Sequence, residues 1–152
     1  KGLDKKPRIL VVDDDETIRT TMKVILQDEG YTVDLAATGK EAIQKTQENA
    51  YNLALLDIRL PDIEGVELLK LLKDNVPRTR KIMVTGYPSM QNAITALNKN
   101  ADAYLLKPVD VEKLLKTVKD QLQAQKEEQK FNEQKVAEFI ESRVKEMSPK
   151  DS

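Results

Sequence analysis

The chain has 152 residues, enough for one well-buried core and a short extension. Hydrophobic residues make up 39%, charged residues 34%, and the formal net charge is -1, as in an ordinary globular protein. Proteins that bind nucleic acid or an anionic membrane usually carry an excess of positive charge, and a membrane-spanning helix needs a run of roughly 20 apolar residues. The chain has neither, so we expect a cytoplasmic protein that by itself binds neither nucleic acid nor membrane.

The residue types also limit the chemistry. Neither cysteine nor histidine occurs in the chain. This excludes disulfides, thiolate and imidazole metal ligands, and a Ser-His-Asp triad. Any reaction here must use carboxylates, hydroxyls and ammonium groups.

Short apolar runs alternate with stretches of helical periodicity. The runs are RILVV (8–12), YTVDLA (31–36), NLALL (52–56), KIMV (81–84) and AYLL (103–106). Four of them are almost wholly apolar, which is typical of strands covered on both faces. A helical stripe follows each run, the second one weaker because it includes a threonine: Ile18, Met22, Ile25 and Leu26; Ala42, Ile43 and Thr46; Val66, Leu69 and Leu72; Met90, Ala93, Ile94 and Leu97; Val111, Leu114, Leu115, Val118 and Leu122. Five strand–helix units in alternation predict an α/β fold with a doubly wound, five-stranded parallel sheet.

The fifth predicted helix has no stop signal, because residues 110–147 contain neither glycine nor proline. Within 123–135 only Ala124 and Phe131 are apolar, which predicts a segment solvated on all sides. Apolar spacing returns in VAEFIESRVKEM (136–147). Two interpretations stay open: a frayed polar tail with a helical tip, or a helix that binds another copy or another domain.

Polar residues of matching chemistry follow four of the apolar runs. Asp13 and Asp14 follow the first run, Asp57 the third, Thr85 the fourth and Lys107 the fifth. Ligands of doubly wound sheets bind outside the carboxyl ends of the strands, so we expect these side chains at one edge. The three aspartates offer only hard oxygen ligands, which suits Mg²⁺.

A divalent cation would also offset the repulsion within the consecutive aspartates of VVDDDET (11–17). A carboxylate beside Mg²⁺ can attack phosphorus and form an acyl phosphate. Mg²⁺ and the Lys107 ammonium would neutralise the charge on the phosphoryl oxygens, and the Thr85 hydroxyl could bond one of them. The pattern therefore predicts phosphoryl chemistry.

Four motifs, VVDDD, LLDIRLPDIEG, MVTG and YLLKP, occur in this order within residues 7–120. In combination and spacing they resemble the receiver domain of two-component response regulators. The resemblance implies a flavodoxin-like sheet of strand order 2-1-3-4-5 with five helices, the last one extended. It implies a receiver domain at 1–122. The uninterrupted last helix adds a helical extension or linker at 123–152, for which dimerisation or docking is one of the two interpretations above.

The resemblance also implies the residues of a phosphorylation site. Asp57 looks like the phosphorylated aspartate and a metal ligand. Asp14 looks like a direct Mg²⁺ ligand, Asp13 like one that acts through water, and the backbone carbonyl of Arg59 like a further ligand.

Further residues correspond to the phosphate-binding and switching positions of the family. Thr85 looks like the switch hydroxyl, and Tyr104 like the aromatic that turns inward when Thr85 moves toward phosphate. Lys107 looks like the phosphate-binding lysine. The Lys107–Pro108 bond looks like the family's cis peptide.

The function implied by the resemblance is that of a phosphoacceptor in signalling. Its partner would be a histidine kinase or a histidine phosphotransfer protein, and its reactions only Mg²⁺-dependent self-phosphorylation and autodephosphorylation. Phosphorylation would switch the surface of the fourth helix, fifth strand and fifth helix, and with it the docking or self-association of 123–147. One form of that output would be a homodimer through the extended last helix.

Two alternatives remain open. DDDET (13–17) also fits Asp-x-Asp-x-Thr, the nucleophile motif of haloacid-dehalogenase-like phosphatases, with Asp13 as nucleophile and Asp15 as general acid. That interpretation leaves Asp57 without a role, and Asp15 is also typical of a helix N-cap. The other alternative is a receiver fold that acts as a dimerisation or docking module without phosphorylation. No helix-turn-helix follows the motifs, so DNA binding by this chain is not expected.

Overall fold

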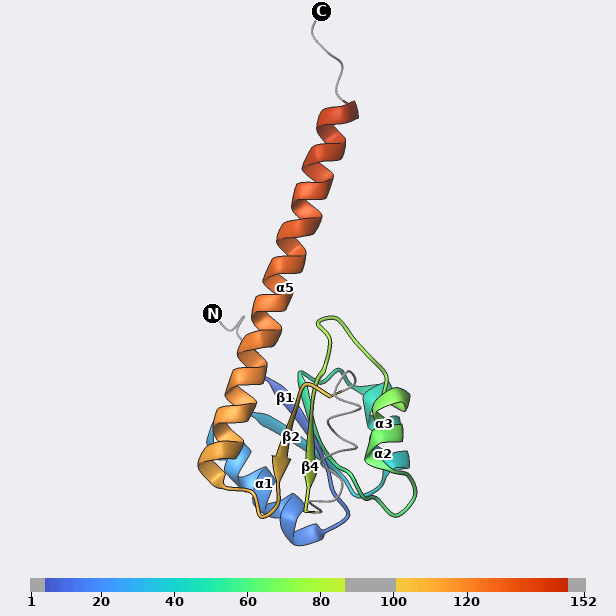
Figure 1. Cartoon of the computed structure of the whole chain (residues 1–152), viewed down its shortest axis with the longest axis vertical. Coiled ribbons are helices and arrows are strands. Elements are labelled where there is room, and N and C mark those ends of the chain that lie inside the picture. Colours follow the sequence, from blue (N-terminus) through green and yellow to red (C-terminus); the bar gives the residue numbers. More distant parts are fainter. Residues whose placement is uncertain (1–4, 87–100, 148–152) are drawn as a thin grey trace, which may run out of the picture.

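The computed structural model describes residues 5–86 and 101–147 (Figure 1). Five parallel strands form one sheet of order β2-β1-β3-β4-β5, so the predicted fold class and strand order are confirmed. The strands are β1 (Arg8–Val12), β2 (Thr32–Ala36), β3 (Leu53–Asp57), β4 (Arg80–Thr85) and β5 (Ala103–Leu106). The described helices are α1 (Glu16–Asp28), α2 (Gly39–Glu48), α3 (Gly65–Leu71) and α5 (Val111–Met147). The predicted helix around Met90 to Leu97 lies outside the described residues.

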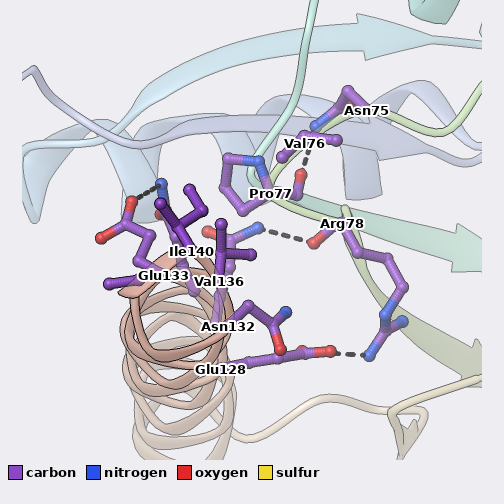
Figure 2. A pocket seen from close by; sticks show the side chains of 12 residues that line it. Asn75, Val76, Pro77, Arg78, Glu128, Asn132, Glu133, Val136 and Ile140 are labelled. Atoms are coloured by element: carbon purple, nitrogen blue, oxygen red, sulfur yellow. Dashed lines mark hydrogen bonds and ion pairs between the residues drawn. The ribbon is translucent and has the colours of Figure 1, made fainter. Parts of the chain in front are cut away.

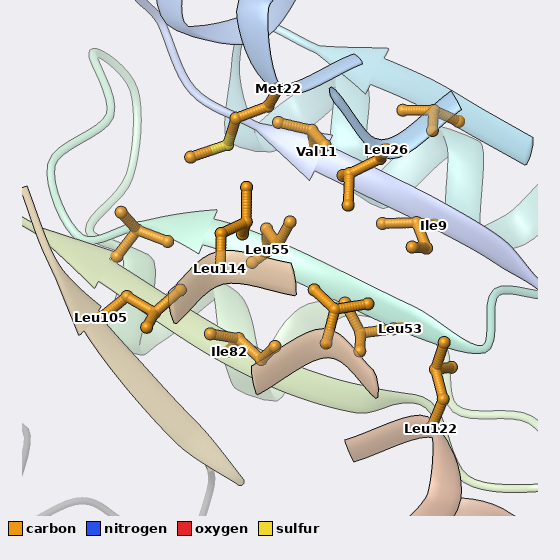
Figure 3. Close-up of a cluster of buried hydrophobic side chains, with 13 residues drawn as sticks. Ile9, Val11, Met22, Leu26, Leu53, Leu55, Ile82, Leu105, Leu114 and Leu122 are labelled. Atoms are coloured by element: carbon orange, nitrogen blue, oxygen red, sulfur yellow. The ribbon is translucent and has the colours of Figure 1, made fainter. Parts of the chain in front are cut away.

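Each face of the sheet has its own apolar core, because successive side chains of a strand point to opposite faces. Figure 1 shows α1 and α5 on one face and α2 and α3 on the other. The residues in Figure 3, among them Ile9, Leu55 and Ile82 from the strands and Leu26 and Leu114 from the helices, form the first core. Leu10, Leu56, Met83, Ala42 and Leu68 belong to the second. Burial on both faces explains the nearly continuous apolar runs.

The first helix begins and ends where local chemistry predicts. The Asp15 side chain accepts a hydrogen bond from the Ile18 N–H at 3.1 Å and so caps the helix. Gly30, with a φ of 100°, follows the C-cap residue Glu29, a backbone conformation that glycine adopts without strain. These two residues set the direction in which the chain leaves β1 and returns to β2.

The last helix continues to Met147, but the prediction that 123–135 is solvated on all sides is wrong. Gln125 is 4% exposed. Its Nε2 donates to the backbone carbonyls of Asn52 at 2.9 Å and Arg78 at 2.8 Å, and its Oε1 accepts from Asn52 Nδ2 at 3.2 Å. A buried amide can replace apolar packing when its hydrogen bonds are satisfied, and the apolar pattern does not reveal this.

Charged groups beside Gln125 direct the helix away from the sheet. Arg80 donates from Nε to Gln121 Oε1 at 3.0 Å and from Nη1 to Glu128 Oε1 at 2.9 Å. Beyond these contacts, every residue from 130 to 147 is exposed, and α5 projects from the domain as one long helix (Figure 1).

Among residues 5–86 and 101–147, no helix combines the length and apolarity needed to cross a membrane.

Replacing Gln125 with alanine should lower the free energy of unfolding by about 2 kcal/mol, because two backbone carbonyls and the Asn52 amide lose a buried partner. Gln123→Ala is the matched control, since Gln123 is exposed in the same helix and bonds only along it, to Glu127. Urea unfolding of both variants tests this. Equal losses would show that Gln125 contributes only helix propensity.

Candidate functional site

The carboxyl ends of four strands meet at one edge of the sheet. Parallel register pairs Val12 with Leu56, Asp57 with Val84 and Thr85 with Leu106. The residues at or just after these strand ends therefore share one rim, as the sequence predicts. An open cleft of about 550 Å³ lies there, lined in part by Asp13, Asp14, Asp57, Arg59 and Lys107.

Three carboxylates and one ammonium group form the centre of this cleft. Asp13, Asp14 and Asp57 each offer an oxygen within 4.8 Å of the others. Asp13 is 2% and Asp57 6% exposed, whereas Asp14 is exposed. The Lys107 Nζ lies 2.9 Å from Asp13 Oδ2 and 3.3 Å from Asp57 Oδ2, so its charge offsets their repulsion.

The backbone around Asp13 holds its carboxylate in place. Its N–H donates to the Ala36 carbonyl at 3.1 Å, and Arg19 Nη1 donates to its carbonyl at 2.8 Å. Its Oδ1 accepts from the Asp15 N–H at 2.9 Å. Asp13 therefore turns inward toward Lys107 while Asp15 caps α1.

The loop after β3 folds back closely on Asp57. The Arg59 N–H donates to Asp57 Oδ1 at 3.2 Å, and the Gly65 N–H donates to the Ile58 carbonyl at 2.7 Å. A Cβ at Gly65 would overlap the Asp57 carbonyl oxygen and lie 2.8 Å from the Ile58 Cα, so no other residue type fits here without a backbone shift. Glycine at this position thus allows α3 to start directly beside Asp57.

Asp62 is a residue of this loop whose contact was not predicted. Its Oδ1 accepts from the Gly39 N–H and its Oδ2 from the Lys40 N–H, both at 2.9 Å. These two hydrogen bonds lower the pKa of the exposed Asp62 carboxyl. They tie the loop to the start of α2. No local pattern could reveal this, because the partners are more than twenty residues apart in the chain.

The environment shifts the proton affinity of both Asp57 and Lys107. Burial, and then the charge of Asp13, raise the pKa of Asp57 above its ordinary 3.8, although Lys107 and the Arg59 N–H oppose this. Burial alone would lower the pKa of Lys107, but its hydrogen bond to Asp13 and the charges of Asp13 and Asp57 raise it. The ionised form of Asp57 is therefore destabilised in the folded chain, and a further cation would reduce this destabilisation.

The remaining predicted positions lie along β4, β5 and the turn after them. Thr85 is fully buried at the end of β4, and its carbonyl accepts from the Lys107 N–H at 2.6 Å. Tyr104 is 44% exposed on β5. The Lys107–Pro108 peptide bond is cis, as is Val76–Pro77, which was not predicted.

The donor set fits a hard divalent cation. Three carboxylates converge, one of them on the solvent side, and no nitrogen or sulfur ligand accompanies them among the described residues. Carboxylate oxygen with water is the ligand combination that Mg²⁺ prefers. The aspartates are close enough to be drawn onto one ion.

The sequence profile of the response regulator receiver domain matches residues 9–119. The chain therefore belongs to the response regulator receiver domain family. This family is a different one from the haloacid-dehalogenase-like phosphatases, the alternative in which Asp13 would be the nucleophile.

Named relatives agree with this assignment. The transcriptional regulatory protein ZraR of Klebsiella oxytoca is 40% identical over 114 residues, which are 75% of this chain and 26% of that protein. The chain thus spans about a quarter of the length of ZraR.

Solved receiver structures match at nearly their full length. A CheY-like receiver domain protein from Methanospirillum hungatei JF-1 is 48% identical, with a TM-score of 0.73 over 82% of this chain and 99% of that one. The response regulator TrrA from Thermotoga maritima, solved in complex with Mg(2+)-BeF, is 35% identical, with a TM-score of 0.68 over 76% of this chain and 98% of that one.

The raised pKa of Asp57 predicts how stability changes with pH. A raised carboxyl pKa means that the folded chain binds this proton more readily than the unfolded chain, so ionised Asp57 destabilises the fold. In metal-free buffer, Asp57→Asn should be more stable than wild type above the raised pKa. The difference should shrink as the pH falls toward 3.8 and the wild-type carboxyl is protonated.

Urea midpoints of both proteins at about pH 7 and about pH 3.5 test this prediction. A difference of the same size at both values would contradict it, as would a wild type more stable than the variant at the higher pH.

Proposed function

We propose that Asp57 is the phosphoacceptor of a signalling receiver, taking its phosphoryl group from a histidine kinase or a histidine phosphotransfer protein. The observation that carries this proposal is the pairing of a buried carboxylate with Lys107 and two further aspartates at the carboxyl edge of the sheet. Membership of the receiver family supports it.

In this mechanism Asp13, Asp14, Asp57 and the Arg59 carbonyl would hold Mg²⁺, with Asp13 acting through water. When bound, the ion neutralises charge on the phosphoryl oxygens and on the carboxylates. An Asp57 oxygen attacks phosphorus, the bond to the leaving group of the donor breaks, and an acyl phosphate forms on Asp57.

Lys107 serves the incoming phosphoryl group in this scheme. Its ammonium lies between Asp13 and Asp57, and it would bond an oxygen of the phosphoryl group carried by Asp57. Its raised pKa keeps it charged at neutral pH. Hydrolysis of the acyl phosphate returns Asp57 to its free form, so the chain turns over only its own phosphorylation.

The output of phosphorylation involves Thr85, Tyr104 and α5 in this proposal. Thr85 bonds the phosphoryl group, Tyr104 leaves its exposed position, and the β5–α5 surface changes. The part of that surface expected from the fourth helix lies outside the described residues. Residues up to 122 act as the receiver, and 123–147 act as the extension that carries the output. DNA binding, as in a transcriptional regulator such as ZraR, would belong to other parts of a longer protein.

Incubation with Mg²⁺ and a small acyl-phosphate donor should add one phosphoryl group to the wild-type chain and none to Asp57→Asn. Intact-mass spectrometry measures this directly. Asp13→Asn is the informative control, because it tests the other carboxylate of the buried pair. An adduct that survives Asp57→Asn but is absent from Asp13→Asn would contradict the proposal and restore the phosphatase mechanism.

Asp13→Asn should weaken Mg²⁺ binding about 10–100-fold, the usual effect of losing a group that orients a metal's ligands. The measurement is the rise in the unfolding midpoint with Mg²⁺ concentration, which follows the affinity of the folded chain. Asp15→Asn is the matched control, because asparagine caps a helix as well as aspartate does. Equal effects of the two changes would place the ion elsewhere.

A further inference from the structure

The face of α5 that packs on the sheet continues beyond the receiver. Leu114, Val118, Leu122 and Gln125 are its buried part. Val136 follows Val118 by five full turns of about 3.6 residues and therefore lies on the same face. Ile140 and Met147 continue it toward the end of the helix, flanked by Phe139 and Val144. All five of these distal apolar residues are more than half exposed.

This distal face borders a cleft beyond the amino ends of β3 and β4. The loop 75–78, between α3 and β4, forms the opposite wall, and the cleft measures about 580 Å³. Figure 2 shows Val136 and Ile140 on the side of the helix that faces this loop. Val76 in the loop is 94% exposed and Met147 at the helix tip 81%. Apolar surface gathered in this way is typical of an interaction site.

We propose that a second copy of this chain covers this distal face. The two α5 helices pair antiparallel through residues 136–147, and the tip of each helix lies at the outer end of the other molecule's cleft, where Val136 and Ile140 line it. Met147 of the second copy then lies against Val136. The arrangement has a two-fold axis perpendicular to the helices, so both contacts are the same.

A parallel pair through this face is blocked by the receiver itself. In a parallel pair, the second helix would run along the whole face, including the part that carries Leu114 and Val118. There α5 already packs on the sheet and contacts β3, β4 and β5. The second helix would have to pass through the first domain. An antiparallel pair avoids this overlap, because only the projecting residues beyond 130 lie side by side.

The charges on the distal face also favour the antiparallel direction. Arg143 lies on this face, with its guanidinium 5.2 Å from the Phe139 ring centre and 3.3 Å from Glu146. A parallel pair would bring Arg143 against its own copy, whereas an antiparallel pair places it near Ile140 of the second copy. On the same flank, Lys135 then lies near Glu146 of the second copy, an opposite-charge pair.

The size of this surface sets the expected affinity. Three to four turns of helix make a contact at the small end of specific interfaces. We therefore expect a dissociation constant in the micromolar range, on the order of 1–100 µM. The proposal concerns the unphosphorylated chain and does not depend on the role of Asp57.

Sedimentation of the unphosphorylated chain over this concentration range should show a monomer–dimer equilibrium. Ile140→Lys and Val136→Lys should each weaken it at least about tenfold, because each puts a charge into the apolar contact. Ser142→Lys, which adds the same charge away from the face on the exposed helix, is the matched control and should change it little. A monomer throughout the range, or equal effects of Ile140→Lys and Ser142→Lys, would overturn the proposal.

The direction of the pair can be measured with one spin label, because the chain has no cysteine of its own. Lys119→Cys places the label on an exposed part of α5 within the receiver. At 1.5 Å of rise per residue, the antiparallel pair separates the two labels by about 65 Å. A distance below about 40 Å would show a parallel pair and overturn the proposal. Neither result bears on the phosphorylation of Asp57, which the intact-mass measurement tests separately.

Discussion

The contact of Lys107 with Asp13 and Asp57 is the interaction on which the site depends. Burial, and then the charge of Asp13, raise the pKa of Asp57, because two buried carboxylates repel each other. The Lys107 ammonium, 2.9 Å from Asp13 Oδ2 and 3.3 Å from Asp57 Oδ2, offsets the repulsion between the two carboxylates. Because each of the three residues lies at the end of a different strand, the balance of charge also depends on how β1, β3 and β5 sit relative to one another. A change of charge at Asp57 can therefore reach the backbone around it.

A second polar contact determines where the long helix leads. Gln125 joins α5 to the backbone just before β3 and β4, at the end of the sheet opposite the cleft of the aspartates. Arg80 and Glu128 strengthen the same junction. The helix therefore leaves the receiver in a defined direction, and its apolar face meets the loop that carries Val76.

The strand runs, the two helix boundaries at Asp15 and Gly30, and the aspartates, threonine and lysine of the rim could all be predicted from local pattern. Each follows from chemistry within a few residues or from the rule that parallel strands end at one edge. The burial of Gln125 and the cap that Asp62 places on α2 could not, because their partners are distant in the chain and polar. The scarcity of apolar residues therefore predicted that 123–135 is solvated on all sides. This prediction is wrong for the part of the segment around Gln125.

By itself the sequence determined the parallel sheet and the residue types that could carry phosphoryl chemistry, since periodicity and strand-end residues are local properties. The order of the strands followed from the resemblance of the motifs to those of receiver domains. Only the tertiary structure decided which charges neutralise one another, because that depends on distances between strands. It also decided that the apolar tip of α5 lies on the same side of the helix as the receiver core. That relation rests on an unbroken helix anchored at Gln125, whose hydrogen bonds join residues more than forty positions apart.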